Sequence, residues 1–259
     1  MENYEGFKTD IYKLTQIDLN SYKEKQMRRR IDSLVSKNNC TSYHDYVQLL
    51  RSNKDTFEEF VNFLTINVSE FYRNPEQWDL LVNEFYPELQ KKFGKKLKIW
   101  SAACSTGDEP YSLVMALSKY VPLSDIEIYA TDLDRQVIET AKMGIYSEKS
   151  IANVPEEYKR KYFKQLGKSY QISEDIKKCV KFKEHNLLKD TYPKGYQLIV
   201  CRNVLIYFTD EAKHDVYEKF SQSLVEGGIL FIGSTEQVMD YKTMDYKRRY
   251  SFYYEKESQ

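Results

Sequence analysis

The stretch LKIWSAACSTGDEPYSLVMAL, residues 97–117, decides the fold class of this chain. A short apolar run leads into a loop of small residues, and the loop leads into a helical pattern. Doubly wound sheets bind ligands beyond the carboxyl ends of their strands, at turns of this kind. Gly107 is the only glycine of the loop, so the dinucleotide fingerprint G-x-G-x-x-G is absent. Asp108 and Glu109 suit a cationic or hydroxyl-rich ligand, although acids also favour an ordinary helix N-terminus.

Outward from this stretch, short apolar runs alternate with helical patterns, which is typical of a parallel doubly wound sheet. The predicted strands are 97–103, 126–130, 180–182, 197–201, 228–233 and 250–255, and the predicted helices are 111–120, 135–143 and 211–225. Between residues 162 and 182, two short extended runs flank Gly167 and Lys168. They predict a small antiparallel insert with a two-residue turn.

The chain before residue 65 reads as helices, because apolar side chains recur at helical spacing in three stretches. These are Met27, Ile31, Leu34 and Val35; Tyr43, Tyr46, Val47 and Leu50; and Phe57, Phe60, Val61 and Leu64. A connecting helix is expected from Asn74 to Phe93, with Pro75 near its start and Gly94 after its end. We therefore expect a helical N-terminal domain over 1–70, a linker helix over 71–94 and an α/β domain over 95–259, with the insert at about 160–183.

Composition excludes several classes of protein. The 39 basic and 39 acidic side chains cancel, which argues against wholesale nucleic-acid binding, and 41% hydrophobic residues indicate a folded protein. The four cysteines are far apart, as in a reduced cytosolic protein. No apolar run approaches the ~20 residues that cross a bilayer, and no signal peptide is visible, so we expect a cytoplasmic protein without membrane insertion. His185 and His214 have no partners at metal-ligand spacing, so no metal site is expected.

Polar residues follow the later strands. IEIYATDLD ends its strand at Asp132, where an acid can accept hydrogen bonds from ribose hydroxyls, and Asp134 is a candidate N-cap of the next helix. Further polar ends are Asn186-Leu187 and Asn203-Val204. Their amides suit an adenine edge or an amino-acid group, or simply turns. A cationic nucleoside without phosphates fits these strand ends, and S-adenosylmethionine is such a molecule.

One polar segment lies before the sheet. INVSEFYRNPEQW, residues 66–78, places Asn67, Ser69 and Arg73 at the junction of the two predicted domains. Domain junctions are preferred places for ligand clefts. Asn67 or Ser69 could instead cap the connecting helix, and Arg73 could be a surface charge.

Five segments occur in one order with appropriate spacing: NVSEFYRN, IWSAACSTGDEPYS, ATDLD, HNLL and CRNVLIYF. Together they resemble the CheR-type chemotaxis receptor methyltransferases over nearly the whole chain. The resemblance implies a small all-α N-terminal domain and a Rossmann-like S-adenosylmethionine-dependent methyltransferase domain with an inserted antiparallel β-subdomain. It also implies transfer of methyl groups to glutamate side chains on the cytoplasmic helices of chemoreceptors, with S-adenosylhomocysteine as the second product.

The resemblance further implies roles for single residues. The cofactor contacts are Asn67, Ser69, Arg73, Gly107, Glu109, Asp132, Asn186, Leu187, Asn203 and Val204. Arg73 and Tyr207 are the groups expected to face the reacting centre. This chain departs from the family pattern at two positions, and both departures are minor. The family often has Thr where this chain has Ser69, and it usually has Glu where this chain has Asp108.

Two alternative functions remain. The first is a nucleic-acid methyltransferase, because the predicted helix at 21–37 carries a local net charge of +4 and basic helices bind phosphates. Against it, CRNVLIYF lacks the proline-containing turn that stacks a flipped base. The second alternative is a non-catalytic S-adenosylmethionine-binding regulatory module.

The expected partner is a receptor. Arg28, Arg29 and Arg30 are taken as one basic face that contacts its helices. Family members that dock on a receptor's C-terminal peptide usually carry a longer, Gly-containing turn in the β-subdomain, whereas YFKQLGKSYQIS is short. We therefore expect a monomer that recognises the receptor body independently of a tail peptide.

Overall fold

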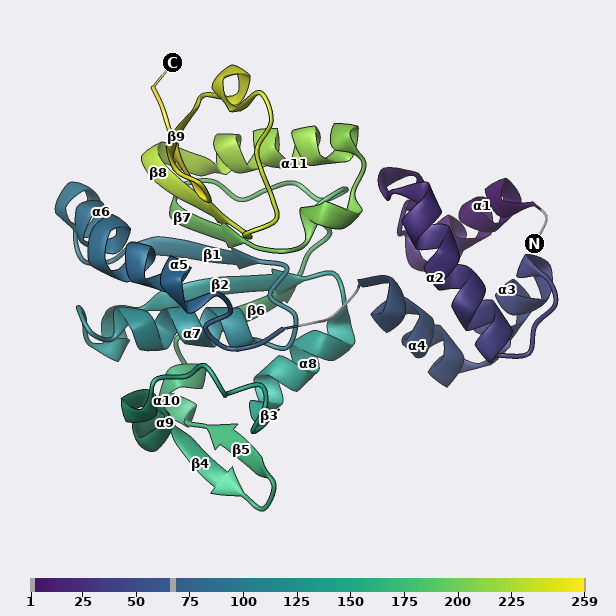
Figure 1. Cartoon of the computed structure of the whole chain (residues 1–259), viewed down its shortest axis with the longest axis horizontal. Helices are drawn as coiled ribbons and strands as arrows, with labels where there is room; N and C mark the ends of the chain where they lie inside the picture. Colours follow the sequence, from purple (N-terminus) through teal and green to yellow (C-terminus); the bar gives the residue numbers. More distant parts are fainter. Residues whose placement is uncertain (1–2, 66–68, 259) are drawn as a thin grey trace. The chain divides into compact units, whose positions relative to one another are not determined.

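The computed structural model describes residues 3–65 and 69–258, so Asn67 lies outside the described residues. The chain divides into two compact units (Figure 1). The helical unit comprises residues 1–66 and 205–215, and the α/β unit comprises residues 67–204 and 216–259. The expected linker, 71–94, falls within the α/β unit. In the described ranges, no helix is long and apolar enough to cross a membrane.

The helical unit is built from amphipathic helices that bury their apolar faces. Its elements are α1 (Tyr4–Thr15), η1 (Leu19–Ser21), α2 (Glu24–Lys37), α3 (Tyr43–Ser52), α4 (Lys54–Thr65), η4 (Leu205–Tyr207) and the first part of α11 (Asp210–Ser223). The apolar residues predicted for α2 and α3 are all buried. In α4, Phe60 and Leu64 are buried, whereas Phe57 and Val61 are half-buried. Phe60 packs edge-on against Phe7 and Tyr46.

A segment from late in the chain completes the helical unit. Tyr22 and Phe208 form an antiparallel bridge, and their rings meet edge to face with centroids 5.1 Å apart. The Lys23 amide donates to the Tyr207 carbonyl at 2.9 Å, and the Thr209 amide donates to the Ser21 carbonyl at 2.9 Å. Residues 205–215 are thus hydrogen-bonded into a unit that the sequence patterns had placed wholly at the N-terminus.

Seven strands of the described chain form the main sheet, in the order β6-β2-β1-β7-β8-β10-β9. They are β1 (Lys98–Ala102), β2 (Glu127–Asp132), β6 (Val180–Glu184), β7 (Tyr196–Cys201), β8 (Leu224–Ile232), β9 (Tyr246–Tyr250) and β10 (Tyr253–Lys256). Because β1 pairs in parallel with both β2 and β7, the strand order reverses between β1 and β7. This reversal confirms the doubly wound fold, a class in which ligands bind beyond the carboxyl ends of the strands at such a point.

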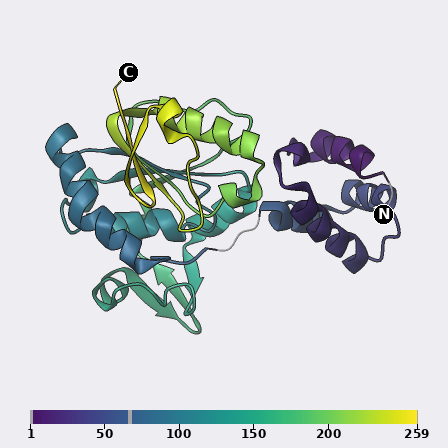
Figure 2. The same ribbon diagram turned by 45° about the horizontal axis from the view of Figure 1, so that its top comes forward.

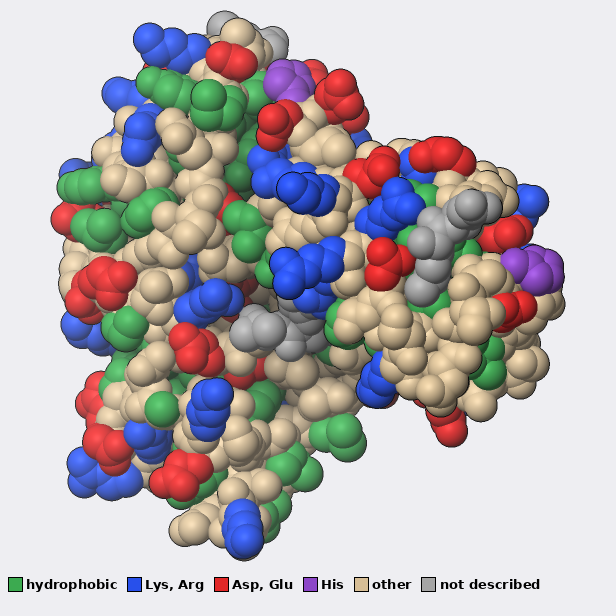
Figure 3. Space-filling model, turned by 45° about the vertical axis from the view of Figure 1, so that its right-hand side comes forward, with side chains coloured by type: hydrophobic (Ala, Val, Ile, Leu, Met, Phe, Trp, Pro, Cys, Tyr) green, Lys and Arg blue, Asp and Glu red, His purple; other side chains and the backbone are tan. Residues whose placement is uncertain are grey.

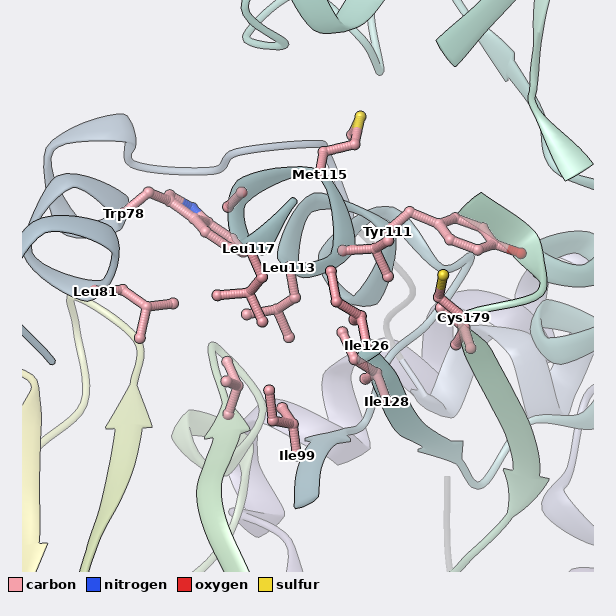
Figure 4. Packing of buried hydrophobic residues seen from close by; sticks show 14 of the residues in the cluster. Trp78, Leu81, Ile99, Tyr111, Leu113, Met115, Leu117, Ile126, Ile128 and Cys179 are labelled. Atoms are coloured by element: carbon pink, nitrogen blue, oxygen red, sulfur yellow. The ribbon is translucent and has the colours of Figure 1, made fainter. Parts of the chain in front are cut away.

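Helices cover both faces of the sheet (Figure 2). Successive side chains of β1 point to opposite faces, so Ile99 and Trp100 mark the two layers. Ile99 belongs to a buried cluster with Trp78, Leu113 and other side chains on one face (Figure 4), whereas Trp100 contacts Phe220 of α11. The remaining elements of this unit are α5 (Pro75–Leu80), η2 (Leu81–Phe85), α6 (Tyr86–Phe93), α7 (Asp108–Leu117), η3 (Leu123–Asp125), α8 (Arg135–Met143), α9 (Glu156–Tyr162), α10 (Glu174–Lys177) and η5 (Tyr241–Met244).

The connecting helix is interrupted rather than continuous. Pro75 begins α5 and Gly94 caps α6, as predicted. Between them, residues 81–85 form a π-helical turn. Pro87 follows this turn and has no amide hydrogen to continue an α-helical ladder, which is an ordinary cause of such an irregularity.

The small sheet has the order β3-β5-β4, from β3 (Ile145–Ser147), β4 (Phe163–Leu166) and β5 (Ser169–Ile172). Leu166 pairs with Ser169, which confirms the two-residue turn. The predicted limits of this sheet were wrong. It also contains β3, which has only three residues and no visible alternation, and the run from residue 180 belongs to β6 of the main sheet.

Two C-terminal assignments also need correction. The single strand predicted over 250–255 is a hairpin of β9 and β10, which pair antiparallel. The helix predicted over 211–225 ends at Ser223, and the strand predicted over 228–233 begins earlier, at Leu224, so Gly227 also lies inside β8. Tertiary pairing with β7 extends this strand beyond its apolar run.

Gly144 ends α8 with φ +67°, and a Cβ added there would lie 2.8 Å from Ile172 Cγ2. Gly167 is a matched control, because it has φ +60° and no neighbour within 4 Å. Left-handed backbone costs an L-residue ~1–2 kcal/mol, and overpacking adds ~1–3 kcal/mol. We therefore expect Gly144→Ala to lower the free energy of unfolding by ~1–3 kcal/mol more than Gly167→Ala. Urea denaturation measures both values, and equal losses would contradict the packing argument.

Candidate functional site

The loop between β1 and α7 has an unusual backbone. Ala103, Ser105 and Gly107 all adopt positive φ angles, of 61°, 48° and 88°. A Cβ at Gly107 would also lie 2.9 Å from the Ala141 Cβ. Strained backbone of this kind persists where surrounding structure holds it, and it clusters at ligand sites. Gly107 is therefore required by the loop itself, because a side chain there would meet both an unfavourable φ and a close neighbour.

Asp132 holds the loop from the end of β2. Its Oδ2 accepts a hydrogen bond from the Ser105 amide at 2.8 Å, and its Oδ1 accepts one from the Asp134 amide at 3.0 Å. Burial raises the pKa of Asp132 to about 6, and these backbone amides oppose the shift. Asp134 accepts from the Gln136 amide at 2.8 Å, which confirms it as the N-cap of α8.

Glu109 lies in the first turn of α7. Its Oε1 accepts a hydrogen bond from the Ser101 hydroxyl at 2.9 Å, and its Oε2 lies 3.9 Å from Arg202 Nη1. Burial raises the pKa of Glu109 to about 7, although Arg202 and Ser101 oppose the shift. The site therefore contains a carboxyl group that titrates near neutral pH.

Asp108 is also buried, and burial raises its pKa. The Thr106 hydroxyl donates to its Oδ2 at 2.5 Å, and the hydroxyl groups of Thr106 and Ser69 oppose the pKa shift. Ser69, a predicted cofactor contact, therefore lies beside the loop between β1 and α7.

Arg202 is the site residue that the sequence patterns did not single out. It follows β7, is 7% exposed, and donates from Nη2 to the Arg73 carbonyl at 2.8 Å and to Gln77 Oε1 at 2.8 Å. Its guanidinium also lies 4.8 Å from the centre of the Phe231 ring. The available signal was a cation directly after a buried strand, at residue 202 of CRNVLIYF.

Arg73 is half-buried, and Arg202 fixes its backbone. Its positive charge contributes to lowering the pKa of Glu109. The structure thus brings Arg73, Arg202 and Glu109 together, although 36 residues or more of sequence separate Arg73 from the other two.

Asn186 and Leu187 follow β6. The His185 amide donates to the Asp132 carbonyl at 2.9 Å, which keeps this turn beside the end of β2. Asn186 Oδ1 accepts from the Leu188 amide at 2.9 Å, so this oxygen serves the turn. Leu187 is buried.

Asn203 and Val204 follow β7, and Asn203 has φ +61°. Both backbone amides donate to the carboxylate of Glu236, at 2.8 and 3.0 Å. Asn203 Oδ1 is buried, and no described residue hydrogen-bonds to it. Glu236 was not predicted from the sequence, because it binds backbone atoms and belongs to no recognised motif.

The remaining predicted residues belong to the helical unit. Tyr207 lies in η4. Arg28, Arg29 and Arg30, expected to contact a receptor, are consecutive residues of α2, so their side chains point in different directions. The Arg28 guanidinium lies 5.0 Å from the centre of the Tyr4 ring, and Arg30 Nη2 donates to the Phe63 carbonyl at 2.6 Å. Arg29 is exposed.

Comparisons with known proteins agree over both units. Residues 67–252 match a family model described as "CheR methyltransferase, SAM binding domain", and residues 2–65 match "CheR methyltransferase, all-alpha domain". A chemotaxis protein methyltransferase of Listeria innocua is 42% identical over 224 residues, which is 86% of each chain. One of Borreliella burgdorferi is 32% identical over 249 residues, covering 91% of this chain and 88% of that protein.

The raised pKa of Glu109 predicts how stability depends on pH. The folded protein holds this proton more tightly than the unfolded chain does, where the pKa is near 4.5. The stabilisation is complete below pH 4.5 and is lost as pH rises through 7. Between pH 5 and pH 8, we expect the free energy of unfolding of the parent, relative to Glu109→Gln, to fall by about 2 kcal/mol. Asp132 titrates in the parent and in Glu109→Gln alike, so its contribution cancels in the difference between them. A constant difference in urea denaturation across this pH range would refute the assignment.

Proposed function

Because this chain belongs to the CheR methyltransferase family, whose cofactor is S-adenosylmethionine, we propose that it methylates glutamate side chains on the cytoplasmic helices of chemoreceptors. The products are glutamate methyl esters and S-adenosylhomocysteine. The observation that carries the proposal is the buried carboxylate of Asp132 at the end of β2. It accepts a hydrogen bond from the loop between β1 and α7, which has left-handed backbone and follows the strand at which the strand order reverses. The alternatives, a nucleic-acid methyltransferase or a non-catalytic module, are not favoured, since close relatives are named chemotaxis protein methyltransferases.

Unpaired polar atoms around the site fit this cofactor. Ser105 Oγ, Asp108 Oδ1 and Asn203 Oδ1 are buried and have no hydrogen-bond partner within the described ranges. Buried polar atoms in folded proteins nearly always have partners, so these three favour a polar ligand. When bound, S-adenosylmethionine supplies a methyl group that its sulfonium has already activated.

We propose that the cofactor contacts gather at the carboxyl ends of the parallel strands. They are Ser69, Arg73, Gly107, Glu109, Asp132, Asn186, Leu187, Asn203 and Val204, with Asn67 retained as a proposed contact. Asp132 accepts hydrogen bonds from the ribose hydroxyls, because its two oxygens keep lone pairs beyond those used by backbone amides. The buried acids Asp108, Glu109 and Asp132 together favour a cationic ligand.

The proposed reaction needs no general base. A glutamate carboxylate has a reference pKa of ~4.3 and is already ionised near pH 7. Arg73 and Tyr207 would orient this carboxylate toward the methyl group. Correct alignment of the reactants and exclusion of water would lower the reaction barrier, by up to ~7–11 kcal/mol. Both residues must hold the carboxylate weakly, because its charge is consumed as the ester forms.

We further propose a cytoplasmic monomer that recognises the receptor body without a tail peptide. The turn of the small sheet supports this, because only Gly167 and Lys168 separate the paired residues Leu166 and Ser169. Acidic and basic side chains are interspersed on the face shown in Figure 3, so local contacts rather than a single-sign field would guide docking.

Asp132→Ala should weaken S-adenosylmethionine binding ten- to hundredfold, since hydrogen bonds to a charged group contribute ~1.5–3 kcal/mol. Transfer of radiolabelled methyl groups from limiting cofactor to receptor-containing membranes should fall in parallel. Asp134→Ala is the matched control, because it removes a neighbouring acid that caps α8. Calorimetric affinity for Asp132→Ala within twofold of the parent would remove Asp132 from the site. Absence of any transfer by the parent would reject the proposed function.

Arg29 is the cleanest probe of receptor recognition, because Arg28 and Arg30 make contacts within the helical unit. Arg29→Glu should raise the apparent KM for receptor several-fold and leave calorimetric cofactor affinity intact. The effect should shrink with added salt, since exposed charges are screened beyond ~8 Å at physiological ionic strength. Arg160→Glu, an exposed reversal on α9, is the control. An unchanged KM across a salt series would place the receptor contact elsewhere.

A further inference from the structure

Glu236 links two turns at the carboxyl edge of the sheet. It lies just after β8 and is 7% exposed. Its Oε2 accepts hydrogen bonds from the amides of Asn203 and Gly233, both at 2.8 Å, and its Oε1 accepts one from the Val204 amide at 3.0 Å. A single buried carboxylate therefore satisfies three backbone donors from the turn after β7 and the turn after β8.

The turn at Asn203 is held from Glu236. Asn203 has φ +61°, a left-handed conformation that asparagine adopts more readily than most residues, and the three hydrogen bonds fix where this turn lies against the turn after β8. The two turns are also packed closely, because a Cβ added at Gly233 would lie 2.7 Å from the Asn203 nitrogen and 2.8 Å from its Nδ2. The Asn203 conformation thus depends on the hydrogen bonds that the backbone amides donate to the Glu236 carboxylate, and on the missing side chain at Gly233.

We propose that Glu236 is a positioning residue for S-adenosylmethionine: it sets the backbone of Asn203 and Val204 and so fixes how these two residues meet the cofactor. This inference rests on the proposed cofactor role of Asn203 and Val204. Glu236 acts through them and needs no contact of its own with the cofactor.

Glu236→Gln tests the inference with little change in shape. Glutamine has one acceptor oxygen and one NH₂ donor, so at least one backbone amide of the turns would face another donor. We expect the calorimetric affinity for S-adenosylmethionine to fall about tenfold, while the apparent KM for receptor stays within twofold. A Cβ added at Gly233 would also lie 2.7 Å from Glu236 Oε2, so Gly233→Ala should produce a similar loss by pushing on both the turn and the carboxylate that holds it.

Tyr254→Phe is the matched control. Its hydroxyl accepts a hydrogen bond from the Val238 amide at 3.3 Å, in the same loop as Glu236 but away from Asn203. It should retain the parent affinity for S-adenosylmethionine. Folding of every variant is checked by circular dichroism and thermal unfolding. Normal affinity in folded Glu236→Gln and Gly233→Ala, or an equal loss in Tyr254→Phe, overturns the inference.

A double-mutant cycle with Asn203→Gly separates this inference from the proposed function. Glycine keeps the positive φ and removes the amide side chain. If Glu236 acts through this turn, Glu236→Gln should cost less affinity in the Asn203→Gly background. Strictly additive losses overturn the inference alone. Absence of methyl transfer to receptor by a parent protein that binds S-adenosylmethionine overturns the proposed substrate and leaves Glu236 in its positioning role.

Discussion

The buried guanidinium of Arg202 is the constraint on which the site depends. A charge removed from water must find partners, because an uncompensated buried ion costs several kcal/mol. Arg202 finds them in the Arg73 carbonyl, the Gln77 side chain and the nearby carboxylate of Glu109. Arg73 and Gln77 precede the sheet and Glu109 lies in the first turn of α7, so satisfying one charge draws two distant segments to the carboxyl end of β7.

Around this cation the α/β unit concentrates acids under conditions that disfavour their ionised forms. Burial raises the pKa of Asp108, Glu109 and Asp132, and hydroxyls or backbone amides only partly offset it. Such a site favours a cationic ligand over a neutral one of the same shape, because the ligand charge makes ionisation of the acids less costly. In the proposed site, the strained loop and the acids would together allow a positively charged cofactor to approach the backbone closely.

Local sequence patterns predicted much of this arrangement. Residues 97–117 predicted a strand, a ligand loop and a helix, because an apolar run and its loop chemistry are contiguous. Asp134 could be assigned as a helix cap because it directly precedes the helix that it caps. Strand β3 was missed because three residues show no period. Strand β9 was missed because Lys247, Arg248 and Arg249 interrupt its apolar pattern, so that only the aromatic run after them was predicted as a strand. Glu236 was missed because it accepts hydrogen bonds from backbone amides, which no side-chain pattern reveals. Arg202 was missed because its partners lie in segments far from it in the sequence.

Residues 205–215 belong to the helical unit, and this has a consequence for dissecting the protein. A fragment cut between the two matched family regions would separate Tyr22 from Phe208 and leave the Lys23 and Thr209 amides without their carbonyl partners. The helical unit is therefore not a detachable module. Its last structural component is synthesised some 140 residues after its helices. During synthesis on a ribosome, the helical unit cannot be completed until most strands of the sheet have emerged. Both units therefore finish folding late in synthesis.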